Sequence, residues 1–210
     1  MRKILIVGAS FLQVPAIIKA KEKGYWVAVA DYNPTAVGIP YADAYFNVST
    51  IDSDGLLKVA ESIKPDGIMT MATDMPIRAI SFVTSRLNLV GHSPEVAYAA
   101  TDKIEMIKRF KKSQVASPWF FVADTFNDLI TKLTDFSLPI IIKPADSSGS
   151  RGVILVRESE KLQDAFLYSK TFSHSGSVIV EQYLEGDEVS VELFVIGCEP
   201  IVLAITDKTT

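Results

Sequence analysis

The chain has 210 residues, of which 48% are hydrophobic, so it can bury one large core or two smaller ones. Its 21 basic and 25 acidic residues leave a net charge of −4, which gives no broad attraction to nucleic acid or to an acidic membrane. We therefore expect neither as a partner. The single cysteine, Cys198, excludes an internal disulfide and favours a reducing, cytoplasmic location.

The first 95 residues alternate between short apolar strands and amphipathic helices. The strands are expected at residues 3–7, 26–30, 46–48, 67–71 and 89–91, with helices in the longer gaps between them. Such alternation is typical of a parallel sheet with helices on both faces. We therefore predict an α/β domain of Rossmann-like type over residues 1–95.

The pattern changes after residue 95. Residues 96–100 and 104–112 have the spacing of two helices, and either Thr101 or Asp102 could cap the second one. We expect residues 96–114 to link two domains. From residue 115 onward, strands at hairpin spacing (140–143, 152–157, 177–182, 188–196 and 200–205) and helices at 126–133 and 160–170 predict an α+β lobe.

One lysine closes an aliphatic strand directly before a loop of small residues. Lys143 ends the run that begins at Pro139, and the loop contains Ser147, Ser148, Gly149, Ser150 and Gly152. Free backbone N–H groups beside one ammonium group suit phosphate oxygens. The alternative is an ordinary flexible hairpin with a surface lysine. A Walker loop is excluded, because its Gly-x-x-x-x-Gly-Lys-Ser/Thr pattern is absent.

Acidic residues surround a break between two later strands. Glu181, Glu185 and Glu188 lie on either side of Gly186. One carboxylate could accept the amino hydrogen of adenine and another could hold ribose hydroxyls, while the connecting backbone reads the edge of the ring. Taken alone, such acids are more often a solvated turn.

Together with an Asp-Lys pattern at a helix start, Asp102-Lys103, these two segments resemble the ATP-grasp superfamily over essentially the whole chain. The resemblance implies a pre-ATP-grasp domain at 1–95 and a nucleotide-binding lobe at 115–210. It implies that Lys103 and Lys143 contact the phosphates of ATP and that the loop of residues 147–152 covers them. By the same resemblance, the base and ribose of ATP are held by Ile141 on the adenine face, Glu181 at the amino group, the backbone of Gln182, Tyr183 and Leu184 at the ring edge, and Glu188 at the ribose.

The resemblance also implies an activity. Such proteins are ATP-dependent ligases that use Mg²⁺ and join a small-molecule carboxylate to an amine or thiol through an acyl-phosphate, and they can be homodimers. An amino-acid or peptide ligase is the favoured interpretation, ahead of a purine-pathway or carboxylase-type enzyme. The magnesium ligands are expected beyond residue 210, so we expect an incomplete lobe that is not active alone, and no catalytic or metal-binding residue is assigned. Ser150 departs from the glycine found in many members.

Two other functions compete with this interpretation. Gly8 follows the first strand and Asp31 ends the second, as in a nicotinamide-dependent oxidoreductase, but neither later glycine of Gly-x-Gly-x-x-Gly is present. A nucleotide-sensing module without catalysis is the other alternative.

Overall fold

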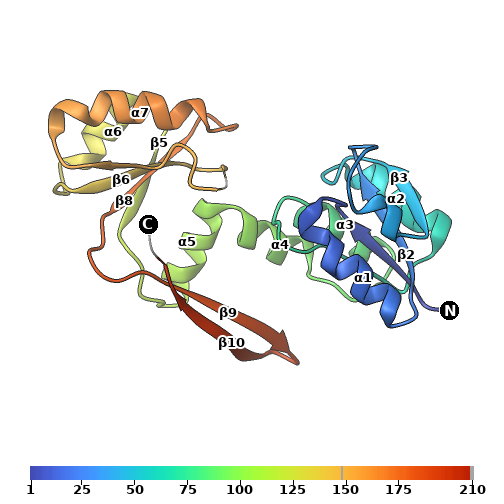
Figure 1. Cartoon of the computed structure of the whole chain (residues 1–210). Helices are drawn as coiled ribbons and strands as arrows, with labels where there is room; N and C mark the ends of the chain where they lie inside the picture. The colour runs from blue at the N-terminus through green and yellow to red at the C-terminus, as the bar shows by residue number, and fades with distance from the viewer. Residues whose placement is uncertain (148, 209–210) are drawn as a thin grey trace. The chain divides into compact units, whose positions relative to one another are not determined.

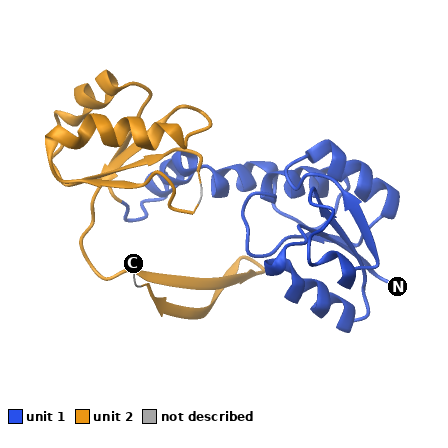
Figure 2. Ribbon diagram, turned by 45° about the horizontal axis from the view of Figure 1, so that its top comes forward, with its two compact units in different colours: residues 1–117 blue, residues 118–210 orange. Residues whose placement is uncertain are grey.

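The computed structural model describes residues 1–147 and 149–208. The chain divides into two compact units, residues 1–117 and 118–210 (Figure 2). Among the described residues, no helix is both long and apolar enough to cross a bilayer.

The first unit is built on a parallel sheet whose four strands lie in the order β3-β2-β1-β4. The strands are β1 (Lys3–Val7), β2 (Trp26–Asp31), β3 (Ala44–Asn47) and β4 (Gly67–Met69). β1 and β2 are buried for most of their length because both are inner strands. The parallel sheet predicted from the alternation of strands and helices is confirmed.

Helices cover both faces of this sheet. Successive side chains of a strand point to opposite faces, and in β1 both sets are apolar and need a covering layer. Leu5 and Val7 pack against α2 (Ser53–Ile63) and α3 (Ile77–Arg86), whereas Ile6 packs against α1 (Val14–Glu22). A short 3-10 turn, η1 (Phe11–Gln13), precedes α1, and a second one, η2 (Ile39–Tyr41), precedes β3. The unit ends with α4 (Pro94–Thr101) and α5 (Lys103–Lys112) (Figure 1).

The strand predicted at residues 89–91 is wrong. The backbone N–H of Leu89 donates to the carbonyl of Thr84 at 2.9 Å, and Asn88 has φ of 51°, so this segment ends α3 instead of joining the sheet. Val90 is 95% exposed. Two apolar residues followed by a glycine were too short a pattern to distinguish a strand from the end of a helix.

The second unit contains an antiparallel sheet in the order β5-β8-β6-β7. Its strands are β5 (Phe120–Ala123), β6 (Ile140–Pro144), β7 (Ile154–Val156) and β8 (Val178–Gln182). The helices α6 (Phe126–Leu133) and α7 (Leu162–Thr171), the latter preceded by η3 (Ser159–Lys161), pack on one face of the sheet through a single core. β5 was not predicted from the sequence.

A separate two-stranded sheet follows, made of β9 (Val189–Ile196) and β10 (Glu199–Asp207). Both strands are exposed along almost their whole length, although they are rich in valine, leucine and isoleucine. Gly197 and Cys198, with φ of 58° and 69°, form the turn between them. The predicted hairpin at 188–205 is confirmed.

Candidate nucleotide-binding site

The face of the second sheet that is turned away from α6 and α7 holds three of the predicted site residues. In β6, Ile140 and Ile142 join the core under the helices, so Ile141 and Lys143 lie on the other face. The register pairs Ile141 with Glu181 of β8, which puts Glu181 on that face too. Ile141, Lys143 and Glu181 are therefore neighbours, although 38 residues separate the last two in the chain.

Lys143 and Glu181 form an ion pair on this face. The ammonium Nζ donates to Oε1 of Glu181 at 2.6 Å, and the two side chains are only 18% and 13% exposed. A hydrogen bond between two charged groups that are mostly shielded from water is stronger than a surface ion pair. The sheet thus brings together a cation, which could contact an anionic ligand, and a carboxylate, which could accept an amino hydrogen.

The loop after β6 contains three residues in the left-handed region of φ. Gly149 and Gly152 have φ of 70° and 74°, and Ser150 has φ of 56°, where a side chain is uncommon. Ser150 stands where the resemblance implies a glycine in many proteins, and it takes the left-handed conformation that a glycine adopts readily. Of the other predicted loop residues, Ser147 is half-buried, whereas Ser148 lies outside the described residues.

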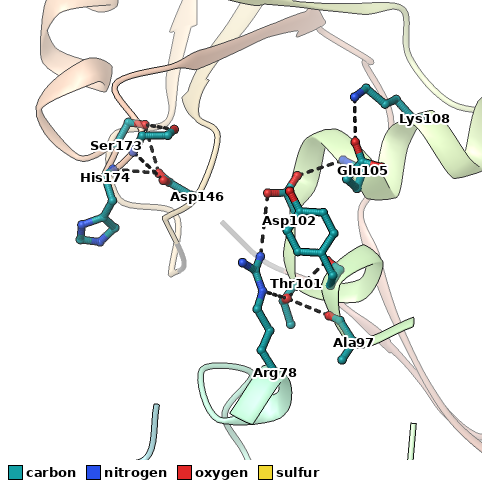
Figure 3. A network of polar contacts seen from close by, with 11 residues as sticks. Arg78, Ala97, Thr101, Asp102, Glu105, Lys108, Asp146, Ser173 and His174 are labelled. Carbon is teal, nitrogen blue, oxygen red and sulfur yellow. Dashed lines mark hydrogen bonds and ion pairs between the residues drawn. The ribbon is translucent and has the colours of Figure 1, made fainter. Parts of the chain in front are cut away.

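Both ends of this loop are fixed by the segment between α7 and β8. A Cβ added at Gly152 would lie 2.8 Å from Cδ2 of Phe172, so the backbone there packs closely on that ring. At the other end, Asp146 accepts hydrogen bonds from the Ser173 hydroxyl at 3.0 Å, from the His174 N–H at 2.9 Å and from the Ser175 N–H at 2.7 Å (Figure 3).

These hydrogen bonds favour the ionised form of the Asp146 carboxyl group. Burial acts to raise the pKa of its carboxyl group, but the hydrogen bonds from the backbone of Ser175 and His174 and from the hydroxyls of Ser173 and Ser175 outweigh burial and hold the pKa below its usual range. Sequence reasoning treated Asp146 only as part of the loop. The available signal was an acid at the start of a run of small residues, where Asp often binds nearby backbone.

The segment predicted to read the edge of the adenine ring, residues 182–184, leaves the sheet at the end of β8. The N–H of Gln182 donates to the carbonyl of Trp119 at 3.0 Å. The ring of Tyr183 lies 5.4 Å from the guanidinium carbon of Arg157, and Leu184 is 60% exposed.

Glu188, the predicted ribose ligand, forms an exposed ion pair with Lys208 at 2.9 Å. Glu188 is therefore engaged at the base of the hairpin, directly before β9.

Lys103 belongs to the first unit, where it is the first residue of α5. Asp102 caps this helix, since its Oδ1 accepts the N–H of Glu105 at 3.0 Å. Of the two residues that could have capped the helix, Asp102 is the one that does. The cap fixes the backbone from which the Lys103 side chain starts.

The carboxylate on which the oxidoreductase alternative depended accepts backbone N–H groups from two segments, one after β1 and one after β2. Asp31 is only 7% exposed, and its two oxygens accept the N–H groups of Ala9 at 2.8 Å and Asn33 at 2.9 Å. A ribose hydroxyl would have to share these oxygens with the two N–H groups. Within residues 1–147 and 149–208, no three His, Cys, Asp or Glu side chains are grouped to hold a metal ion, so we derive no step through magnesium.

Residues 136–210 match the ATP-grasp domain family. The chain is 25% identical over 190 residues to the formate-dependent phosphoribosylglycinamide formyltransferase of Bacteroides thetaiotaomicron, a match that covers 89% of this chain and 49% of that protein. It superimposes on N5-carboxyaminoimidazole synthetase of Staphylococcus aureus, solved with ADP, with a TM-score of 0.84 at 16% identity, covering 100% of this chain and 55% of that one. The chain is thus similar to ATP-grasp proteins over most of its length, and the family match itself covers residues 136–210.

A third similar ATP-grasp protein is the alanine–anticapsin ligase of Bacillus subtilis. It is 26% identical over 224 residues, and the match covers 96% of this chain and 47% of that protein. The chain spans about half the length of the curated relatives it matches. The family match begins just before β6, so it includes Lys143, Asp146 and Glu181.

Proposed function

We propose that this chain binds ATP for a ligase that joins a small-molecule carboxylate to an amine or thiol. The observation that carries the proposal is the ion pair between Lys143 in β6 and Glu181 in the neighbouring strand β8. The loop that follows β6 contains three residues with left-handed φ. In the proposed complex, Lys143 contacts a phosphate and Glu181 accepts the amino group of adenine. Ile141 supplies an apolar surface for the ring, and the backbone of residues 182–184 reads its edge.

Lys103, at the start of α5, is proposed as a second phosphate contact, and Glu188 as the ribose ligand. Because Glu188 is paired with Lys208 in the structure, ribose binding would have to break or share that exposed ion pair. Exposed ion pairs contribute on the order of 0–1 kcal/mol, so the exchange costs little.

The reaction that we propose passes through an acyl-phosphate. A carboxylate oxygen of the first substrate attacks the γ-phosphorus of ATP, and the bond to the bridging oxygen breaks as ADP leaves. The amine or thiol then attacks the acyl carbon, phosphate leaves and the nucleophile loses a proton. Mg²⁺ would accompany ATP and supply positive charge to its phosphates when bound, but the described residues provide no ligand set for it. Amino acids are the proposed substrate class, supported by the similarity to a protein named alanine–anticapsin ligase. The proposed setting is the cytoplasm.

Titration calorimetry of the chain with ATP, adenosine and NAD tests the nucleotide assignment. We expect ATP to bind with magnesium present, adenosine to bind more weakly and NAD not to bind. Binding of NAD in preference to ATP would overturn the proposal. ADP release that depends on both an amino acid and a second substrate separates a ligase from a module that only senses nucleotide.

A further inference from the structure

Arg78 contacts the short corner that joins α4 to α5. Its Nε donates to Oγ1 of Thr101 at 2.6 Å, and its guanidinium carbon lies 4.6 Å from the centroid of the Tyr98 ring (Figure 3). Its Nη2 is 3.8 Å from Oδ2 of Asp102. One side chain of α3 therefore reaches the last turn of α4 and the cap of α5.

The residues that Arg78 contacts fix where α5 begins. Thr101 is the last residue of α4, and its hydroxyl also donates to the carbonyl of Ala97 at 2.8 Å. Asp102 uses its other oxygen, Oδ1, to cap α5. A planar guanidinium group can donate to one neighbour, pair with another and stack on a ring at once, which an ammonium group cannot do. Arg78 thus restrains the corner in several directions immediately before Lys103.

We propose that Arg78 is a positioning residue for Lys103. By holding Thr101 and Asp102, it sets the direction in which the Lys103 side chain leaves α5, and therefore how well the ammonium meets a phosphate. This proposal rests on the proposed function, in which Lys103 contacts ATP. The Arg78 side chain is 47% exposed, so its contacts contribute little to overall stability and their main effect is geometric.

The test compares ATP and adenosine binding across matched variants. Arg78→Ala should weaken ATP binding roughly threefold to tenfold, because contacts that couple a network to a site are typically worth this much. Adenosine binding and the melting temperature should change little. Arg86→Ala is the control, since Arg86 lies on the same helix and its guanidinium stacks on Phe82, with 5.1 Å to the ring centroid. We expect Arg86→Ala to bind ATP as the wild type does.

A double-mutant cycle shows whether Arg78 acts through Lys103. If it does, Arg78→Ala combined with Lys103→Met should bind ATP no more weakly than Lys103→Met alone, since the second change removes what the first one positions. Additive losses would overturn the proposal. Thr101→Val, which removes the hydroxyl while keeping the shape, should reproduce the effect of Arg78→Ala if that variant fails to fold.

The outcomes separate this inference from the proposed function. If the wild type binds ATP and Lys103→Met weakens binding, but Arg78→Ala and Thr101→Val behave like Arg86→Ala, the positioning role is wrong and the function stands. Equal losses of ATP and adenosine affinity in Arg78→Ala would also overturn it. If the wild type binds no ATP, the proposed function fails and this inference fails with it.

Discussion

Lys143 and Lys103 are proposed to contact the same ligand, but different kinds of structure hold them. Lys143 is fixed by its own charge, through the ion pair with Glu181 on a sheet face. Lys103 starts a helix whose first turn is set by Asp102 and by the contacts of Arg78. The comparison teaches that changes around Lys143 should act through charge, whereas changes around Lys103 should act through backbone geometry.

The largest effect is expected from removing the charge of Lys143. Lys143→Met keeps the length of the side chain but loses one charge-assisted contact, which costs on the order of 1.5–3 kcal/mol. ATP affinity should therefore fall roughly tenfold or more, as measured by calorimetry. Adenosine affinity should fall less, because the connector at residues 182–184 is unchanged.

Two companion variants make this result interpretable. Lys143→Met leaves the mostly buried carboxylate of Glu181 without its partner, which can lower stability by itself. Lys143→Met combined with Glu181→Gln removes that isolated charge and should keep the loss of ATP affinity. Lys161→Met, in the exposed ion pair with Glu158 at 3.2 Å, should leave both affinity and stability unchanged. Equal ATP affinity in the wild type and Lys143→Met would refute the phosphate contact.

A smaller effect is expected from removing the helix cap beside Lys103. Asp102→Ala should lower the free energy of unfolding by about 1 kcal/mol and weaken ATP binding, because the first turn of α5 is no longer fixed. Thr125→Ala is the matched control, since Thr125 caps α6 in the second unit by accepting the N–H of Asp128 at 3.1 Å. It should cost similar stability in urea unfolding without the same loss of ATP affinity. If Thr125→Ala weakened ATP binding as much as Asp102→Ala does, the effect of Asp102→Ala would not come from the backbone geometry beside Lys103.

The smallest effect is expected at Asp146 and depends on pH. Because the folded-state pKa of Asp146 is lowered, its ionised form stabilises the protein above the unfolded-state value, near 3.8, and this contribution disappears as the pH falls through the lower folded-state pKa. Asp146→Asn keeps one acceptor oxygen, so the loss of stability should be modest. Melting temperatures of the wild type and the variant should differ most at neutral pH and converge in acid. A difference that grew in acid would contradict this assignment.

The sequence was sufficient where a long local pattern decides the structure, and it failed at residues 89–91, where the pattern was short. The residues of β1 and α6 were predicted with the bounds that they have, and Asp102 was one of two candidate caps. Contacts between distant segments were not predictable. β5 forms by pairing with β8, and Lys143 meets Glu181 only because β6 and β8 adopt one particular register, which the hydrophobic pattern alone does not specify. Arg78 carried no sequence signal, since its partners become neighbours only when α3 and α4 pack.

The turn between β9 and β10 gives the chain a natural attachment point for a reporter group. Cys198 is its only cysteine and is exposed in that turn, next to two strands whose apolar side chains face solvent. A maleimide fluorophore would therefore label this one position without any mutation. Its emission, which shifts to the blue in an apolar environment, would show whether nucleotide or another polypeptide comes to cover the hairpin.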